Sequence, residues 1–120
     1  MNLFESGEDY LERILILKER NGQVRSIDIV NDMGFSKPSV SVAMKKLKES
    51  GYIEIDKNGY ISLTDEGNEI ATRVYERHQV LTKLFVSLGV DEETAMKDAC
   101  KVEHDLSEET FQAIKARLKK

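Results

Sequence analysis

A cysteine, a glutamate and a histidine near the end of the chain have the residue types and spacing for metal chemistry. Cys100, Glu103 and His104 are spaced i, i+3 and i+4, so on a helix all three side chains project from one face. Thiolate, carboxylate and imidazole groups are ligands for transition-metal ions. The spacing therefore indicates a candidate metal site on a helix that we expect to run to about Asp105.

Three further side chains could join this site. His78 lies on the apolar stripe of a long predicted helix, so we expect its ring to point inward. Asp9 and Glu12 are three residues apart and share one face of the first predicted helix. Carboxylates brought close to Glu103 would repel one another and would be costly to bury unless a cation neutralised them.

Each of these residues also has a simpler interpretation. Asp9 could stabilise the N-terminus of its helix, and His78 could be a hydrogen-bonded core histidine. Cys100 could pack as a small hydrophobic side chain, and Glu103 with His104 could form a solvated helix end. Their joint occurrence on three helices that must pack together favours a metal site.

Hydrophobic periodicity and capping residues predict a mainly helical fold with one hairpin. Asn58-Gly59 is a strong hairpin signal between two short alternating segments. The predicted elements are helices over 7–20, from the N-cap Ser26 to Gly34 and from Ser36 to Gly51, strands over 52–55 and 60–63, and helices from Thr64 to Gly89, from Asp91 to about Asp105 and from Ser107 onward.

Two helices joined by a short turn and followed by a hairpin form the winged helix-turn-helix order. Val40 and Met44 should pack inward, which leaves a basic and polar outer face on the third helix. Lysines can hold phosphates, whereas serine, proline and valine side chains can reach base edges. The expected DNA-binding residues are Ser36, Lys37, Pro38, Ser39, Ser41, Val42, Lys45, Lys46, Lys57 and Asn58. A helical bundle with a solvated lysine face is the simpler alternative.

Composition narrows the class of protein. The 120 residues are 40% hydrophobic and 33% charged, which is typical of a globular protein of one domain or two small ones. No apolar run is long enough for a membrane span, and the acidic N-terminus does not resemble a signal peptide. One cysteine cannot form an internal disulfide. We therefore expect a cytoplasmic protein with no membrane partner.

The net charge of −4 would by itself argue against a nucleic-acid partner. However, the basic residues are unevenly distributed. The segment from Ser36 to Ser50 holds four lysines and a single acid, whereas acids gather near both ends of the chain. A basic strip on an acidic protein is compatible with DNA binding, and a bound cation would shift the balance further.

Several segments resemble the diphtheria-toxin-repressor family of metal-dependent bacterial transcription regulators. They are EDYLERI, SKPSVSVAMKKLKESGYIE, LTDEG, ERHQVL and ACKVEHDLS, and the resemblance covers essentially the whole chain. The manganese-transport-regulator branch is the closer match in length. The resemblance implies a homodimer whose winged helices bind double-stranded operator DNA when Fe(II) or Mn(II) is bound, and a repressor of metal-uptake genes without a small-molecule substrate.

The resemblance also implies a ligand set. Asp9, Glu12, His78, Glu103 and His104 fall on ligands of the manganese branch. That branch has a carboxylate at the position of Cys100, whereas the iron branch has a cysteine.

Two further positions differ from the iron branch, which has a histidine where Met96 stands and a glutamate where Thr82 stands. It also has a methionine in place of Asp9. Because thiolate strengthens binding of Fe(II), Co(II) and Zn(II), we expect Fe(II) as the activator, with Mn(II) effective at higher concentration and Co(II) or Zn(II) binding in vitro.

We expect a winged helix-turn-helix domain over residues 1–65, whose first helix contributes to the metal site, and a helical dimerisation and metal-binding domain over 66–120. The SH3-like domain of longer family members is not expected. Apolar residues expected to exceed the needs of one small core, and so to serve dimerisation, are Phe85, Leu88, Val90, Phe111, Ile114 and Leu118.

Two other hypotheses remain open. A winged-helix regulator gated by a small organic effector would need no cation, and its acids would be exposed and spread apart. A metallohydrolase would use Glu12 or Glu103 as general base beside an open metal position. The chain has no HExxH-type pair, and its ligand set is saturated rather than open, so we do not expect an enzyme.

Overall fold

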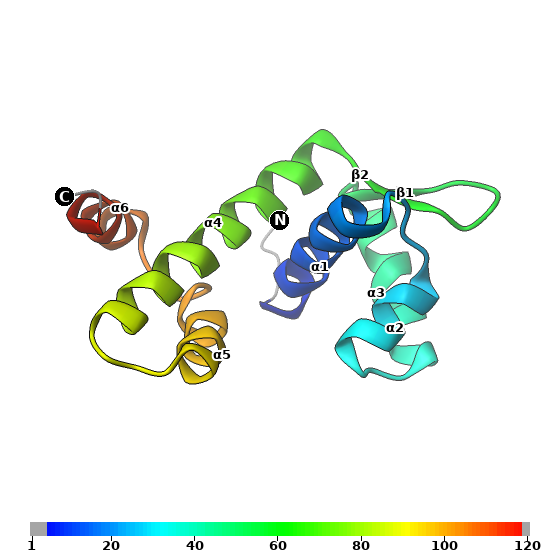
Figure 1. The fold of residues 1–120 in the computed structure, drawn as a ribbon. Helices are drawn as coiled ribbons and strands as arrows, with labels where there is room; N and C mark the ends of the chain where they lie inside the picture. The colour runs from blue at the N-terminus through cyan, green and yellow to red at the C-terminus, as the bar shows by residue number, and fades with distance from the viewer. Residues whose placement is uncertain (1–4, 119–120) are drawn as a thin grey trace. The chain divides into compact units, whose positions relative to one another are not determined.

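The computed structural model describes residues 5–118. Its elements are α1 (Glu5–Asn21), α2 (Ser26–Met33), α3 (Lys37–Glu49), β1 (Ile53–Ile55), β2 (Ile61–Leu63), α4 (Asp65–Ser87), α5 (Glu92–Val102) and α6 (Glu108–Leu118) (Figure 1). The chain forms two compact units, one up to Thr72 and one from Arg73, and α4 begins in the first and continues into the second. The predicted mainly helical fold is confirmed.

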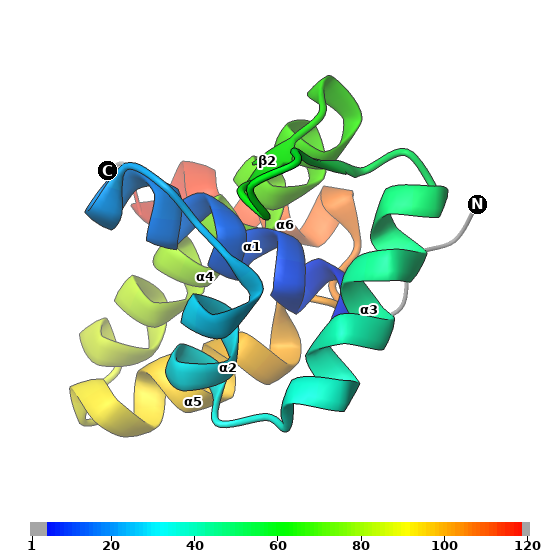
Figure 2. The ribbon, with the colours of Figure 1, turned by 90° about the vertical axis from the view of Figure 1, so that its right-hand side faces the viewer.

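The first unit is a winged helix-turn-helix. Figure 2 shows the turn that joins α2 to α3, and β1 pairs with β2 in antiparallel register, with Ile55 opposite Ile61. The backbone N–H of Ile61 also donates to the Val24 carbonyl (2.7 Å), which ties the hairpin to the segment before α2. The core that these elements enclose consists of Tyr10, Leu11, Ile14, Leu17, Val24, Ile29, Val40, Met44, Leu47, Tyr52, Ile53, Ile61 and Ala71.

Capping residues define most of the helix starts, as the sequence predicts. The Ser36 side chain accepts a hydrogen bond from the Ser39 backbone N–H (3.2 Å), and the Asp91 side chain accepts one from Thr94 (3.0 Å). Ser107 caps α6 in the same way (3.1 Å). These short polar side chains satisfy backbone donors that a helix start leaves without a partner.

Two predicted helix limits are wrong. Arg25, not Ser26, is the N-cap of α2, because the Asp28 carboxylate accepts the Arg25 backbone N–H (2.8 Å) and so fixes the extended residue one position earlier. The helix α5 ends at Val102 rather than about Asp105, and Glu103 is its C-cap. Each strand begins one residue later than predicted, at Ile53 and at Ile61.

Apolar side chains of the second unit pack between α4, α5 and α6. The buried ones are Val74, Leu81, Ala95, Ala99 and Phe111. Phe111 is 1% exposed, so the expectation that it serves a dimer surface is wrong: its ring belongs to the interior of this unit. None of the helices within residues 5–118 has the length and apolar character needed to cross a lipid bilayer.

The start of α4 is held close to the segment that follows α3. The Thr64 hydroxyl donates to the Gly51 carbonyl (2.7 Å) and accepts from the Gly67 backbone N–H (3.2 Å). The approach is so close that a Cβ added at Gly67 would overlap the Tyr52 carbonyl oxygen. Glycine is therefore required here by contact and not by backbone conformation.

We predict that Gly67→Ala lowers the free energy of unfolding by about 2 kcal/mol, because overpacking against rigid backbone outweighs the gain of up to ~1 kcal/mol that alanine brings to a helix. Urea denaturation of the purified variant measures this. The control is Asn68→Ala at the exposed neighbouring position, which should be neutral or slightly stabilising. A Gly67→Ala variant as stable as Asn68→Ala would contradict the prediction.

Candidate metal centre and nucleic-acid interface

The carboxylate of Glu103 is buried between two imidazole rings. Glu103 is 1% exposed, and its Oε2 lies 3.2 Å from Nδ1 of His78 on α4. Its Oε1 lies 3.5 Å from Nε2 of His104, whose side chain is only 3% exposed. The end of α5 and the middle of α4 thus bring together two of the predicted ligands from positions 25 residues apart.

Cys100 belongs to the same group of side chains. A ligand atom of Cys100 lies within 4.8 Å of one of Glu103, and the cysteine is half-buried. Although α5 ends at Val102, Glu103 keeps a right-handed helical conformation (φ −57°, ψ −26°), and its N–H still donates to Ala99. The expected i, i+3 relation between Cys100 and Glu103 therefore persists one residue beyond the helix.

The donor set of the second unit fits a divalent transition ion. Two imidazoles, one thiol and one carboxylate offer nitrogen, sulfur and oxygen atoms, which is the ligand chemistry of first-row metals. A carboxylate at 1% exposure is stable only when hydrogen-bonded, paired with a positive charge or bound to a cation. His78 and His104 both lie against this carboxylate.

Asp9 and Glu12 lie in the first unit, both on α1. Asp9 is half-buried, whereas Glu12 is 4% exposed, which is unusual for a carboxylate. The two positions share one face of α1, as the sequence predicts from their spacing. A second buried carboxylate in the predicted ligand set strengthens the interpretation that these acids have a cation partner.

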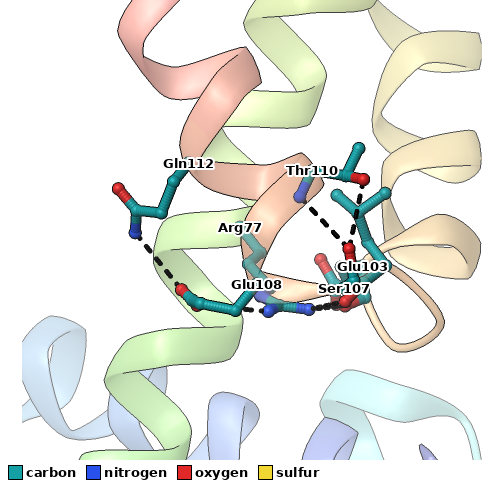
Figure 3. A network of polar contacts seen from close by, with 7 residues as sticks. Arg77, Glu103, Ser107, Glu108, Thr110 and Gln112 are labelled. Atoms are coloured by element: carbon teal, nitrogen blue, oxygen red, sulfur yellow. Dashed lines mark hydrogen bonds and ion pairs between the residues drawn. The ribbon is translucent and has the colours of Figure 1, made fainter.

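Sequence reasoning missed Arg77, the residue before His78. Its guanidinium donates to the carbonyl oxygens of Glu103 (3.1 Å) and Leu106 (2.6 Å), so it holds the turn that carries two of the candidate ligands (Figure 3). The signal was present, because Arg77 falls on the apolar stripe between Val74 and Leu81. An arginine at such a position needs buried partners.

The outer face of α3 presents the predicted polar and basic side chains to solvent. Within this helix Val40, Met44 and Leu47 are buried, whereas Val42 is 55% exposed. The exposed residues of the predicted set on this helix and its cap are Ser36, Lys37, Pro38, Ser39, Ser41, Val42, Lys45 and Lys46. A helix of this kind, with lysines around a small apolar centre, has the chemistry to enter a DNA major groove.

The hairpin supplies the remaining predicted residues. Lys57 and Asn58 are exposed in the loop that links β1 to β2. The Asp56 carboxylate accepts the backbone N–H groups of Asn58 (2.8 Å) and Tyr60 (3.0 Å), which gives the loop a defined shape. Arg25, a residue that sequence reasoning missed, lies over the Tyr60 ring (4.4 Å) and links the hairpin to the start of α2.

Family models match both halves of the chain. The model of the iron-dependent repressor N-terminal DNA-binding domain matches residues 2–61, and that of the iron-dependent repressor metal-binding and dimerisation domain matches residues 64–120. The chain belongs to the iron-dependent repressor family. Members of this family are metal-dependent transcriptional regulators and not enzymes, so the resemblance seen in the sequence is confirmed.

Curated relatives of this iron-dependent repressor homologue are also regulators. An HTH-type transcriptional regulator of Methanocaldococcus jannaschii is 36% identical over 118 residues, which are 97% of this chain and 94% of the relative. The transcriptional regulator MntR of Escherichia coli O157:H7 is 37% identical over 108 residues, which are 90% of this chain and 70% of that protein.

Solved structures of the family share the fold. A manganese-dependent transcriptional repressor in complex with manganese superposes with a TM-score of 0.85 at 28% identity, covering 93% of this chain and 52% of that one. The T. acidophilum IdeR structure superposes with a TM-score of 0.82 at 26% identity, covering 100% of this chain and 56% of that one. The chain thus spans about half the length of these structures.

The cap of α3 allows a test that separates folding from DNA contact. Ser36→Ala should lower the free energy of unfolding by about 1 kcal/mol, because the bond from the Ser39 N–H is lost. Ser36→Asp should stay close to the wild type in stability, because aspartate is an equally good cap. It should nevertheless weaken DNA binding, since a negative charge then faces phosphate. Thermal unfolding and fluorescence anisotropy measure the two effects, and a Ser36→Asp protein that binds DNA normally would exclude Ser36 from the interface.

Proposed function

We propose that this protein is a metal-activated DNA-binding regulator that binds double-stranded operator DNA as a homodimer when Fe(II) or Mn(II) is bound. One observation carries the proposal: the buried Glu103 carboxylate lies between His78 and His104 in a chain whose other half is a winged helix-turn-helix. The nitrogen, sulfur and oxygen donors around it fit a transition ion. The organic-effector alternative has no comparable observation in its favour.

The proposed ligand set is Asp9, Glu12, His78, Cys100, Glu103 and His104. We assign residues 1–65 to DNA binding and 66–120 to metal binding and dimerisation, with α1 contributing to the metal site. Four ligands come from the second unit, where Cys100, His78 and His104 each approach Glu103. The two acids of α1 add oxygen donors. Glu12 is the more deeply buried of the two, so its carboxylate depends more on compensating groups.

Ligands drawn from both units give metal binding a way to control DNA binding. A dimer reads two half-sites whose separation is set by the DNA helix, so the recognition helices must be held at a matching distance. An ion held by ligands of both units would favour the arrangement of the dimer that binds DNA. The free energy by which metal favours the DNA-binding arrangement equals the difference between its binding free energies to the two arrangements.

Exposed apolar side chains of the second unit support dimerisation. Leu88 is 71% exposed, and Val86 (44%), Met96 (46%) and Val102 (37%) are also accessible. Apolar side chains gathered on one small unit indicate an interaction surface. The matching family model is named for dimerisation as well as metal binding, which supports assigning the homodimer contact to this unit.

The proposed DNA contacts divide by chemistry. Lys45, Lys46 and Lys57 carry charge at exposed positions, which suits contacts to phosphates. Pro38 and Val42 present apolar groups that suit thymine methyl groups, and exposed serines beside them can reach base edges. The first group supplies affinity for any sequence, whereas the second group supplies preference for one operator.

We assign the protein to the cytoplasm, where it would repress genes for metal uptake. A cell with sufficient metal has no need of further uptake, so a regulator that binds DNA only in the metal-bound state is suited to repression. The thiol of Cys100 favours Fe(II), while three carboxylates keep the site accessible to Mn(II).

Metal removal tests the function directly. With Mn(II) or Fe(II) buffered at saturation, we expect operator affinity on the order of 5- to 150-fold above that in EDTA, the range of ordinary allosteric couplings. Glu12→Gln should fold but lose this gain, because a ligand charge is missing. The matched control is Glu109→Gln, an equal charge change at an exposed position of α6. Equal DNA affinity of the wild type with metal and with EDTA would contradict metal control and favour the organic-effector alternative.

Metal preference tests the role of Cys100. Cys100→Glu replaces a soft donor by a hard one, so activation by Fe(II) should weaken relative to Mn(II). We expect the ratio of the activating Fe(II) and Mn(II) concentrations to change by about tenfold. Replacing a residue that only orients a ligand already alters metal affinity by about this much, and replacing the ligand itself should do at least the same. Anaerobic titrations followed by DNA binding measure it. An unchanged ratio would make Cys100 a packing residue.

A further inference from the structure

Arg77 is a buried cation whose hydrogen bonds reach backbone carbonyls of the turn that carries two candidate ligands. The residue is 8% exposed and sits on α4 directly before His78. One terminal nitrogen, Nη1, donates to the carbonyl oxygens of both Glu103 and Leu106. The other, Nη2, lies 3.5 Å from the Glu108 carboxylate (Figure 3).

Both carbonyls belong to the turn between α5 and α6, which runs from Glu103 to Ser107. Glu103 is its first residue, His104 follows directly, and Leu106 comes just before the Ser107 cap of α6. A single nitrogen that binds the carbonyls of Glu103 and Leu106 fixes the distance between them, and hence the backbone on which the Glu103 and His104 side chains are mounted. We propose that Arg77 is the positioning residue of the metal site, an inference that rests on the proposed metal-binding function.

Arg77 and His78 hold Glu103 from its two ends. Arg77 binds the backbone carbonyl (3.1 Å), and His78 lies against the side-chain carboxylate (3.2 Å). Because Arg77 and His78 are consecutive residues of α4, two separate contacts fix the distance from this helix to Glu103. Groups that bind and orient the ligands of a metal commonly affect its affinity by about 10- to 100-fold.

Helix α6 completes the environment of the guanidinium. The plane of Arg77 lies over the Phe111 ring, with 5.2 Å from Cζ to the ring centre. Hydrogen bonding from Gln112, followed by the charge of Arg77, holds the pKa of Glu108 below its usual value, so the carboxylate stays ionised opposite the cation. Within residues 5–118, the Arg77 Nε is buried without a hydrogen-bond partner. Arg77 therefore binds the turn at some cost to its own hydrogen bonding.

Lysine cannot replace this arrangement. A guanidinium presents a planar fork that reaches several acceptors at once, whereas a lysine ammonium is a compact point charge on a flexible stem. Arg77→Lys keeps the charge near Glu108 but loses the fixed pair of carbonyl bonds. Because it retains charge and much of the side-chain volume, it tests the geometry of the fork rather than electrostatics.

The first experiment uses the metal-free full chain. Amide hydrogen exchange of the wild type should show protection at Glu103 and Asp105, whose N–H groups donate to Ala99 and Val102. Arg77→Lys should raise exchange at these amides by about tenfold or more, since local opening then costs less. Unchanged exchange in the turn would overturn the proposal. If Arg77→Lys does not fold, amide exchange of the wild type tests the proposal by itself. Protection of the turn that arises only after metal is added would then overturn the proposal.

The second experiment measures metal affinity by electron paramagnetic resonance of free Mn(II), without DNA. Arg77→Lys should weaken Mn(II) binding by about 10- to 100-fold. The matched control is Lys115→Gln, which breaks a second ion pair between α6 and α4, from Lys115 Nζ to Glu76 Oε2 (3.1 Å), and leaves the turn alone. Its metal affinity should stay within about twofold of the wild type, as expected for a partly exposed pair. Equal losses in both variants would show a general effect of α6 and overturn the specific role of Arg77.

The two experiments separate the inference from the function on which it rests. If the wild type bound no Mn(II), Fe(II) or Co(II), the proposed function would fail, whereas the metal-free exchange result would still report on the turn. If the wild type bound metal and Arg77→Lys bound it equally well, only the positioning role would fail.

Discussion

Burying the Glu103 carboxylate requires groups that compensate for the water it loses, and the second unit is organised around that requirement. His78 and His104 approach the two oxygens, while Arg77 holds the backbone carbonyl of the same residue. These contacts join α4 to the end of α5, and the Arg77 bonds to Leu106 and Glu108 extend the connection to α6. The polar contacts around one buried carboxylate thus link three helices, in addition to the buried apolar side chains of this unit.

The first unit depends on a different balance. Its core is apolar, and its polar groups serve the connections between elements, as in the hydroxyl of Thr64 at the start of α4 and the carboxylate of Asp56 in the hairpin loop. The side chains on the outer face of α3 are therefore exposed and lie outside the core, and Ser36 caps the helix. A face whose side chains are not needed for folding can vary with the DNA sequence to be read, which suits a family of regulators that recognise different operators.

Charge links the two halves of the proposed function. The chain is acidic overall, and the acids of the proposed metal site add to the repulsion that DNA phosphates would feel. A divalent ion bound at the proposed site would cancel part of this charge. Under the proposed function, metal binding and DNA binding would therefore favour each other electrostatically.

Much of the local structure could be predicted from sequence because capping and periodicity act within one or two helical turns. Ser36, Asp91 and Ser107 begin their helices as expected, since a short side-chain oxygen needs only the N–H three residues on. The ligand types and the spacing of Cys100 from Glu103 were visible for the same reason. The prediction of Ser26 as an N-cap was wrong because the Asp28 carboxylate, inside the helix, accepts the backbone N–H of Arg25 and so places the cap one residue earlier.

Only the tertiary structure could decide which polar groups are buried together. Arg77 and Glu103 are 26 positions apart, and no local pattern states that the guanidinium of one binds the carbonyl of the other. The burial of Phe111 beside the same guanidinium was equally hidden from local pattern, and it removed this ring from the expected dimer surface. The sequence by itself determined the elements and the ligand chemistry, because those depend on neighbours along the chain. The depth and partners of each charge depend on neighbours in space, because desolvation is a property of the packed unit.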